Sequence, residues 1–359
     1  MSDDLEQCLP KENEDAMKTK KATYEKRAIH AVMVVSSGLF SNEAISFLRA
    51  QHDGKSTIPT AVRPCIYNLT GSQIRDMLSK GSYSAVFHVV RMNDNKSLAM
   101  KCESLKSKNP TLRHQARVYE ALKSTISPHF LTYEDRGLVD DRFVFIVLKL
   151  VGKNLIEVLS ECREKKFTMG TAVRVGEQTL AGIRDLHGTG YIHRDIKPDN
   201  FAVGREEDGN LHTIYILDFK FSRKFTGSGK DLRLQREQAA FRGTPRYASI
   251  AALSMKDQSR KDDIESWWYM IIEFMLGKLP WSDLKFLKDT PIEYMSNIIQ
   301  YIDTLQYNSI PDYDHIAAQL ETAMKAYYLS YDTPPDWDLM AEYKGPRYEK
   351  NVLEGIEKA

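Results

Sequence analysis

The ten residues from Tyr191 to Asn200, YIHRDIKPDN, constrain this chain more than any other stretch of its sequence. Asp195, Lys197 and Asn200 follow one another at short spacing, in an apolar frame just after a predicted helix. Side chains of these types can accept a proton, neutralise an anion and ligate a hard cation through oxygen. The alternative is an ordinary polar turn, and the residues that follow in the chain decide between the two.

The stretch resembles the catalytic loop of protein kinases, in which His-Arg-Asp is followed by an asparagine five residues after the aspartate. The resemblance implies that Asp195 accepts the proton of a substrate hydroxyl and that Lys197 neutralises the phosphoryl group during transfer. It also implies that Asn200 binds magnesium. A lysine two residues after the aspartate is the serine/threonine-kinase variant of this loop.

Two further residues stand where this resemblance requires them. Asp218 lies 18 residues after Asn200, beyond a turn and a predicted strand, at the place of the magnesium-binding aspartate. Lys101, in the stretch LAMK, takes the place of the lysine that contacts the α- and β-phosphates of ATP. A lysine after a short strand is usually exposed to solvent, so Lys101 gains this role only from the loop and from Asp218.

Three stretches narrow the resemblance to the casein-kinase-one group, namely FRGTPRYASI (241–250), RKDDIESWWYMIIEF (260–274) and GKLPW (277–281). The chain is similar above all to the tau-tubulin kinase branch of that group. That likeness rests on FRGTPRYASI, on KPDNFAVG and on PPDW at residues 334–337. In total the resemblance covers about residues 70 to 340.

The resemblance implies roles for residues beyond the catalytic loop. Thr244 would bond Asp195 and Lys197, and together with Gly243 it would shape the segment that binds the peptide substrate. Asp263, on a central helix, would hold the backbone of the catalytic loop. Each of these positions also has an ordinary interpretation as core or surface.

On the nucleotide side, the resemblance implies a pocket for adenine. Leu148 would be the gatekeeper of this pocket. Lys149, Leu150 and Val151 would form the hinge whose backbone pairs with adenine. An ordinary buried strand is the other interpretation of this run.

The phosphate-covering loop departs from the kinase pattern G-x-G-x-x-G-x-V. Residues 79–86 read SKGSYSAV, so only the middle glycine, Gly81, is kept. Glycine lets backbone amides approach phosphates closely, and serine is the least damaging replacement because it is small and can donate a hydrogen bond. Gly81, Ser82 and Val86 are therefore still expected to cover the nucleotide.

Gln115 stands where a glutamate is expected to face Lys101. A glutamine keeps a hydrogen-bond acceptor but removes the negative charge. Trading a charge-assisted bond for a neutral one costs about 1–2 kcal/mol. Such a loss weakens a kinase without abolishing its activity.

Lys220 follows Asp218 and Phe219 at a position where kinases carry glycine. Three interpretations are open for this lysine. It can be a harmless solvated side chain, a stand-in for positive charge lost elsewhere in the phosphate site, or a competitor for Asp218 that spoils metal binding.

Two functions follow from these residues. The first is a serine/threonine protein kinase of low activity, which uses ATP and Mg²⁺ and transfers the γ-phosphate to protein hydroxyls. The second is a pseudokinase, a protein-binding scaffold with weak or no phosphotransfer. The first rests on the side chains that would touch the transferred group, and the second on the altered residues around the nucleotide.

Composition sets wider limits on these interpretations. The chain has 359 residues, 42% of them hydrophobic, which is enough for a sizeable core. Basic residues (50) and acidic residues (49) nearly cancel, so no field of the whole chain favours nucleic acid or an acidic membrane surface as a partner. Scattered cysteines and no visible secretion signal or membrane span favour a reducing, intracellular compartment. We expect a monomer in the cytoplasm, with the nucleus as a second location.

The same patterns predict an α+β protein with the two-lobed kinase fold. Residues 1–66 are expected to form a partly disordered extension, 67–340 the kinase domain and 341–359 a C-terminal tail. Within the domain we expect a β-rich N-lobe (67–148) and a mainly helical C-lobe (152–340).

Individual elements are predicted from periodicity and from end signals. Strands are expected at 74–78, 85–90, 97–103 and 142–151, the first three in a small antiparallel sheet. Helices are expected at 111–123, at 171–187 with Gly188 just past the end, and at 262–276 with Gly277 just past the end.

A basic segment follows the stretch around Asp218. Such a run is usually a solvated loop, but in the casein-kinase-one group basic residues here receive acidic or already phosphorylated substrates. We therefore hypothesise that Lys224 and Arg233 bind protein substrates of this kind. The segment covers residues 220–246. After Lys220, its basic residues are Arg223, Lys224, Lys230, Arg233, Arg236, Arg242 and Arg246, and its only acidic residues are Asp231 and Glu237.

Overall fold

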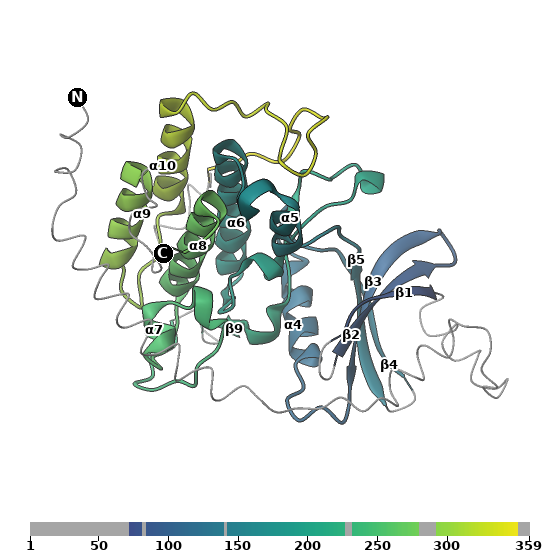
Figure 1. The fold of residues 1–359 in the computed structure, drawn as a ribbon. Helices are drawn as coiled ribbons and strands as arrows, with labels where there is room; N and C mark the ends of the chain where they lie inside the picture. The colour runs from purple at the N-terminus through teal and green to yellow at the C-terminus, as the bar shows by residue number, and fades with distance from the viewer. Residues whose placement is uncertain (1–71, 81–83, 140–141, 227–231, 280–291, 351–359) are drawn as a thin grey trace, which may run out of the picture.

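The computed structural model describes residues 72–80, 84–139, 142–226, 232–279 and 292–350 (Figure 1). The expected N-terminal extension, Gly81, Ser82, Trp281 and residues 351–359 lie outside these ranges. The structure therefore does not test the predictions made for them.

The N-terminal part of the described chain is a five-stranded antiparallel sheet in the order β1-β2-β3-β5-β4. One helix, α4 (Leu112–Leu122), packs against β4 and β5. The predicted strands and the predicted helix at 111–123 are confirmed. The strands are β1 (Ser72–Lys80), β2 (Ser84–Arg91), β3 (Lys96–Ser104), β4 (Tyr133–Val139) and β5 (Phe143–Lys149).

Alternation of side chains gives this sheet two different faces. On β2, Ala85, Phe87 and Val89 are buried in one apolar cluster, to which Leu98 and Cys102 of β3 also belong. Because side chains alternate along a strand, the even-numbered neighbours of Cys102 share its face, and positions 101 and 103 point to the other. That second face is the one that meets α4 and Asp218.

Strand β4 was missed in the sequence. Its residues read YEDRGLV, with three charged side chains in succession and no regular alternation of apolar residues. The strand exists because it pairs along its length with β5, which is apolar almost throughout. Pairing with a neighbour, not local pattern, decides its structure.

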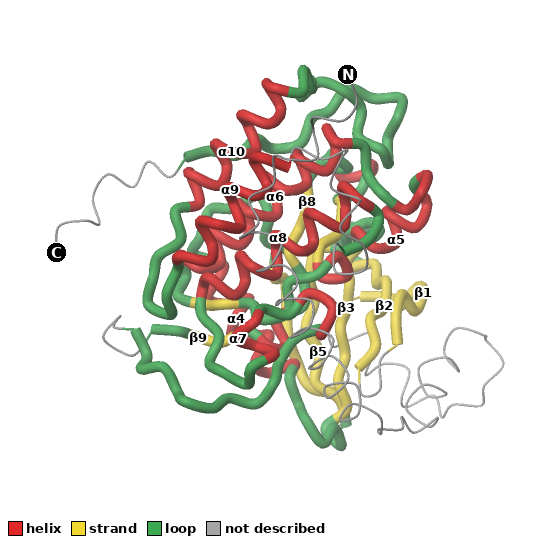
Figure 2. Tube along the Cα trace, turned by 60° about the vertical axis from the view of Figure 1, so that its left-hand side comes forward, coloured by secondary structure: helices red, strands yellow, loops and turns green. Residues whose placement is uncertain are grey.

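The C-terminal part is mainly helical, as predicted. Figures 1 and 2 show the long helices α6, α8 and α10 side by side, with α9 beyond them. Trp267 of α8 is fully buried, and its Nε1 donates to the carbonyl of Gly176 (3.2 Å) and to Thr179 Oγ1 (2.9 Å). The helices are α5 (Leu155–Glu161), α6 (Met169–Gly188), α7 (Ile250–Leu253), α8 (Arg260–Leu276), α9 (Ile292–Thr304) and α10 (Tyr313–Ala326).

The two predicted helix ends have different outcomes. Helix α8 stops as expected at Gly277, which takes a left-handed φ of 74°. The expected end of α6 at Gly188 is wrong, because Gly188 is still helical and the left-handed φ (83°) belongs to Gly190. Thr189 caps the helix end, since its backbone N–H and its hydroxyl both donate to the carbonyl of Leu186, at 3.0 and 2.6 Å.

The described residues after 340 return to the C-terminal lobe. The ring of Tyr343 stacks on His212 with centroids 5.5 Å apart, and its hydroxyl accepts a hydrogen bond from Gln178 of α6. Tyr348 donates to Asp314 of α10 at 2.7 Å. The boundary at 340 stays a prediction, but residues 341–350 contact the lobe directly.

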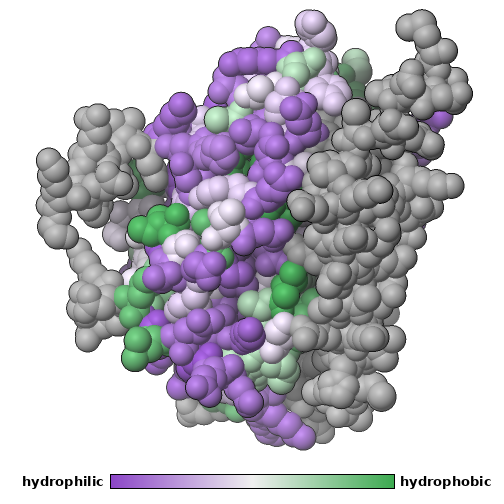
Figure 3. Space-filling view, turned by 90° about the vertical axis from the view of Figure 1, so that its left-hand side faces the viewer, coloured by the Kyte–Doolittle hydropathy of each residue, from purple (hydrophilic) through white to green (hydrophobic). Residues whose placement is uncertain are grey.

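Figure 3 shows the side of the molecule where α9 and α10 lie. Hydrophilic side chains cover most of the described part of this face, with small groups of hydrophobic ones between them. No helix among the described residues is long and apolar enough to pass through a lipid bilayer.

Candidate active site

Two pairs of very short antiparallel strands hold the stretch from Tyr191 to Asn200. Its first two residues form β6 (Tyr191–Ile192), which pairs with β9 (Arg223–Lys224). Directly after it comes β7 (Phe201–Val203), which pairs with β8 (Ile214–Ile216). Leu217 N–H donates to the carbonyl of Asn200 at 2.8 Å. This pairing brings the loop at 193–200 and the residue after Leu217 together.

Asp195 is only 4% exposed, and both of its carboxylate oxygens have partners. Thr244 Oγ1 donates to Oδ1 at 2.7 Å, as expected, and Asn200 Nδ2 donates to Oδ2 at 3.2 Å and to the Asp195 carbonyl at 2.7 Å. The second expected contact of Thr244 is wrong, because no hydrogen bond among the described residues joins it to Lys197. The ammonium group of Lys197 lies instead 3.9 Å from Asp199 Oδ2.

Asp263, near the start of α8, holds the backbone of the catalytic loop. Its two oxygens accept the N–H groups of His193 (2.6 Å) and Arg194 (2.7 Å), and His187 Nε2 lies 2.8 Å from Oδ2. Arg194 has a left-handed φ of 67°, so these bonds stabilise a strained residue. Burial raises the pKa of Asp263, but its bond to His187 and the charge of that ring outweigh burial and keep the pKa below its usual range.

The segment that carries Thr244 approaches the same strained residue. Gly243 has a φ of 115°, and a Cβ atom there would lie 2.7 Å from the carbonyl oxygen of Arg194. Only glycine fits at this distance and in this conformation. The close approach places Thr244 beside Asp195.

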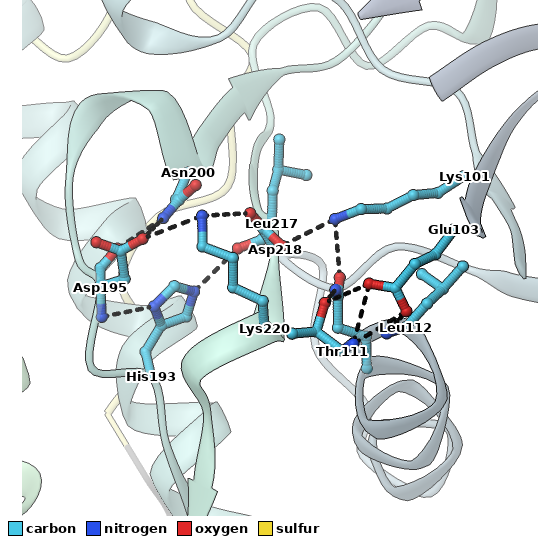
Figure 4. A network of polar contacts seen from close by, with 11 residues as sticks. Lys101, Glu103, Thr111, Leu112, His193, Asp195, Asn200, Leu217, Asp218 and Lys220 are labelled. Carbon is cyan, nitrogen blue, oxygen red and sulfur yellow. Dashed lines mark hydrogen bonds and ion pairs between the residues drawn. The ribbon is translucent and has the colours of Figure 1, made fainter. Parts of the chain in front are cut away.

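On the nucleotide side, Lys101 connects the sheet to both α4 and the loop after β8 (Figure 4). Its Nζ donates to Gln115 Oε1 at 2.9 Å and to Asp218 Oδ1 at 2.8 Å. Gln115 is buried, and its Nε2 donates to Thr111 Oγ1 at 3.2 Å, which fixes the amide orientation. The three residues expected here are therefore in direct contact.

Glu103 is a residue of this region that was not predicted from the sequence. It is buried at the start of α4, where its carboxylate accepts the N–H groups of Thr111 and Leu112 at 2.8–3.0 Å (Figure 4). A negative group there satisfies unpaired amides and favours the helix dipole. The available signal was its spacing, because Glu103 stands two residues after Lys101 and so shares its face of β3.

The predicted hinge, residues 149–151, begins at the last residue of β5. Leu148 is buried, and the Lys149 N–H donates to the carbonyl of Thr132 at 2.9 Å. Lys149 Nζ lies 5.2 Å from the ring centre of Tyr215, and burial lowers the pKa of this lysine. Within the described ranges, no backbone hydrogen bond uses the N–H of Val151. Leu150 is buried next to it.

Val86, the last residue of the phosphate-covering stretch 79–86, pairs with Lys101 across β2 and β3. This register puts the start of β2 beside the lysine expected to contact phosphate. The roles assigned to Val86 and to the hinge residues stay predictions.

Lys220 points into the site, between the two aspartates (Figure 4). Its Nζ lies 3.1 Å from Asp218 Oδ2 and 3.6 Å from Asp195 Oδ2. Burial lowers the pKa of Lys220, but the two carboxylates outweigh burial and raise it overall. The interpretation as a harmless solvated side chain is therefore wrong, while the other two stay open.

Asp218 lies between two ammonium groups. Burial raises its pKa, but the charges of Lys101 and Lys220 outweigh burial and hold the pKa well below the ordinary value. Its backbone has a left-handed φ of 58°, and the next residue, Phe219, is fully buried against His193 and Tyr119. This aspartate is ionised and firmly positioned.

Asn200 and Asp218 offer the oxygen donors that magnesium prefers. Both carboxylate oxygens of Asp218, however, already contact ammonium groups, from Lys101 and from Lys220. In the described part of the chain, no three His, Cys, Asp or Glu side chains gather as a metal site. The residues therefore do not fit a metal ion in this arrangement unless Lys220 moves away.

A sequence profile described as "Protein kinase domain" matches residues 73–333, which is more than half of the chain. The chain belongs to the protein kinase family. The predicted α+β architecture, with a five-stranded antiparallel sheet in the N-lobe and a helical C-lobe, is confirmed. Kinases of this family generally use ATP and Mg²⁺.

Two curated relatives are serine/threonine kinases by name. A probable serine/threonine-protein kinase of Dictyostelium discoideum is 31% identical over 278 residues, which cover 73% of this chain and 55% of the relative. Serine/threonine-protein kinase spe-6 of Caenorhabditis elegans is 32% identical over 282 residues, 72% of this chain and 73% of that protein. This kinase thus spans about half the length of the Dictyostelium protein.

Proposed function

We propose that this kinase transfers the γ-phosphate of ATP to serine or threonine hydroxyls of proteins. The observation that carries the proposal is the setting of Asp195. Its carboxylate is buried, fixed by Thr244 on one oxygen and by Asn200 on the other, and it lies in a loop whose backbone Asp263 holds. A fixed carboxylate acceptor of this kind suits the removal of a proton from a bound hydroxyl.

The transfer follows from these positions. The oxygen of the substrate hydroxyl attacks the γ-phosphorus, and the bond from that phosphorus to the oxygen shared with the β-phosphate breaks. ADP leaves with the electron pair of that bond, and the hydroxyl proton passes to Asp195. Lys197 would supply a positive charge to the transferred group. Lys101 would supply one to the other phosphates, because Gln115 and Asp218 orient the Lys101 ammonium group.

The adenine ring would bind at the hinge. The N–H of Val151 has no backbone acceptor within the described residues, so it can donate to a ring nitrogen. Buried Leu148 would limit the depth of the pocket behind the ring. Both features support the use of ATP by this kinase.

For the finer family we propose the casein-kinase-one group, close to the tau-tubulin kinase branch. The substrates would be acidic or already phosphorylated proteins. In the basic segment, Arg223 and Arg236 already bind the buried carboxylate of Asp257, at 2.5 and 2.6 Å. Lys224 and Arg233 are exposed, so their charges are available to a substrate.

A pseudokinase is the second candidate, and one observation favours it. The Lys220 ammonium group contacts both Asp195 and Asp218, the two carboxylates on which phosphate transfer depends. If this contact persists with nucleotide bound, it would occupy the proton acceptor and stop transfer. The fold would then serve protein binding.

Transfer of labelled phosphate from ATP to casein separates the two candidates. We expect labelled phosphoserine or phosphothreonine from the wild-type chain and none from an Asp195→Asn variant. If the wild-type chain binds ATP but labels casein no more than the Asp195→Asn variant does, the result would favour the pseudokinase. Neutral peptides phosphorylated as fast as acidic or phosphorylated ones would contradict the proposed substrate class.

A further inference from the structure

Lys220 lies where a cation between the two aspartates belongs. Its Nζ is 3.1 Å from Asp218 Oδ2 and 3.6 Å from Asp195 Oδ2, while Lys101 contacts the other oxygen of Asp218 at 2.8 Å. These four side chains carry two negative and two positive formal charges. The carboxylates are therefore neutralised by lysines of the chain itself.

The backbone does not resist a lysine at this position. Residues 219–221 form one 3-10 turn, and Lys220 is not among the described residues with positive φ. The ammonium group also lies over the ring of Phe221, with Nζ 5.1 Å from the ring centre. The two carboxylates and the ring face together hold the ammonium group at the aspartates.

A divalent ion would meet an unfavourable charge at the same place. To reach Asp218 it would have to approach an ammonium group that already contacts Oδ2. Like charges this close repel strongly in a partly buried site. A nucleoside triphosphate would instead be attracted to the same place, because its phosphate oxygens are negatively charged and both lysines are positively charged.

The lysine also has room to reach a ligand. Its side chain is 31% exposed, and a four-carbon stem lets the ammonium group move while keeping three donors. One donor can stay on Asp218 while another turns to a phosphate oxygen. A lysine can in this way bridge a carboxylate and a phosphate, as a metal ion does in other kinases.

We propose that the Lys220 ammonium group replaces a divalent cation in nucleotide binding, so that this kinase binds ATP without Mg²⁺. The inference rests on the proposed function, because it assumes that ATP occupies the site. It concerns binding and is independent of the rate of phosphate transfer. It also assigns to Lys220 the second of the three interpretations, the stand-in for positive charge.

Isothermal titration of the full chain with ATP, in EDTA and in excess Mg²⁺, tests this inference. The wild-type chain should bind ATP with similar dissociation constants in both buffers. Lys220→Met removes the charge at similar size, and it should weaken binding in EDTA about tenfold or more, since charge-assisted bonds to phosphate are lost. Lys220→Gly should bind well only with Mg²⁺, and Lys220→Arg should keep binding in EDTA.

Lys325→Met is the matched control, because Lys325 is exposed on α10 and pairs with Glu321 on the same helix. It should bind ATP as the wild type does. Melting temperatures without nucleotide identify any variant that fails to fold. The inference would be overturned if the wild type bound ATP only in Mg²⁺, or if Lys220→Met bound ATP in EDTA as well as the wild type does. Neither result would overturn the proposed function. No binding of ATP in either buffer would overturn the proposed function as well.

Discussion

At the scale of single residues, the site is a chain of polar contacts in which each side chain positions the next. Gln115 accepts from Lys101, Lys101 pairs with Asp218, and Asp218 with Lys220. Lys220 in turn reaches Asp195. Because the members are coupled, changing the charge of one of them alters the setting of the others.

Gln115→Glu tests the first contact in this chain of contacts. A carboxylate would hold the Lys101 ammonium group more strongly than an amide does, by about 1–2 kcal/mol. We expect kcat/KM for casein to rise about tenfold if that energy appears in the barrier. Glu120→Gln, on the exposed side of the same helix, should leave kcat/KM unchanged. An equal or lower kcat/KM for Gln115→Glu would contradict this account.

The lowered pKa of Asp218 predicts how stability depends on pH. A carboxyl whose pKa is lower in the folded state stabilises that state above its unfolded pKa of about 3.9. That contribution is lost as the pH falls towards the folded pKa. Lys220→Met removes one of the charges that lower it, so the stability difference between wild type and variant should be constant near neutral pH. It should shrink only below about pH 4, as the pH falls through the folded pKa values of Asp218 in the two proteins.

Thermal melting of both proteins between neutral and acid pH measures this difference, with Lys325→Met as control. A difference that stays constant over the whole range would show that Lys220 does not act through Asp218.

At the scale of elements, the position of α4 depends on β3. Two residues of this strand on the same face, Lys101 and Glu103, hold the helix at two points. Glu103 binds the first amides of α4, and Lys101 reaches Gln115 on the next turn. The strand and the helix therefore place the nucleotide-side contacts together.

Glu103→Gln tests this connection. An amide at the start of α4 keeps one acceptor oxygen but turns an NH₂ group towards backbone donors, and it loses the favourable charge. We expect a loss of about 1–2 kcal/mol in the free energy of unfolding, measured in urea. Affinity for ATP should fall with it, because Gln115 moves with the helix. Glu120→Gln is again the control, and equal stability of the two variants would refute the role of Glu103.

At the scale of the whole molecule, the two lobes meet through Lys101 and Asp218, and the residues after 340 pack against the helical lobe. Tyr343 lies between His212 and the guanidinium group of Arg174, which is 4.6 Å from its ring centre. Arg174 in turn donates to three carbonyl groups of residues 330–333. This cluster makes residues 341–350 part of the folded lobe.

Tyr343→Ala should therefore destabilise the protein by about 3 kcal/mol, as for other large-to-small changes of buried aromatic residues. Tyr328→Ala is the matched control, because that side chain is 96% exposed, and its effect should be small. Urea denaturation followed by fluorescence compares them. Equal effects would mean that the C-terminal residues contribute nothing to the lobe.

The sequence allowed the fold and most of the site to be predicted, because these depend on spacing along the chain. The spacing of Asp195, Asn200 and Asp218 along the chain is compatible with only one arrangement of loop and strand. What was missed depends on contacts between separate elements of the fold. Strand β4 exists through its pairing with β5, Glu103 acts on a helix eight residues later, and the place of Lys220 depends on two aspartates together.

The central claim is that Asp195 makes this chain a protein kinase, and the rate of phosphate transfer tests it most directly. Labelled phosphate on casein is followed over time for the wild type, for Asp195→Asn and for Asp303→Asn, an exposed aspartate on α9. We predict clear transfer by the wild type and Asp303→Asn, and a rate at least about a thousandfold lower for Asp195→Asn. A wild-type rate no higher than that of Asp195→Asn would contradict the account.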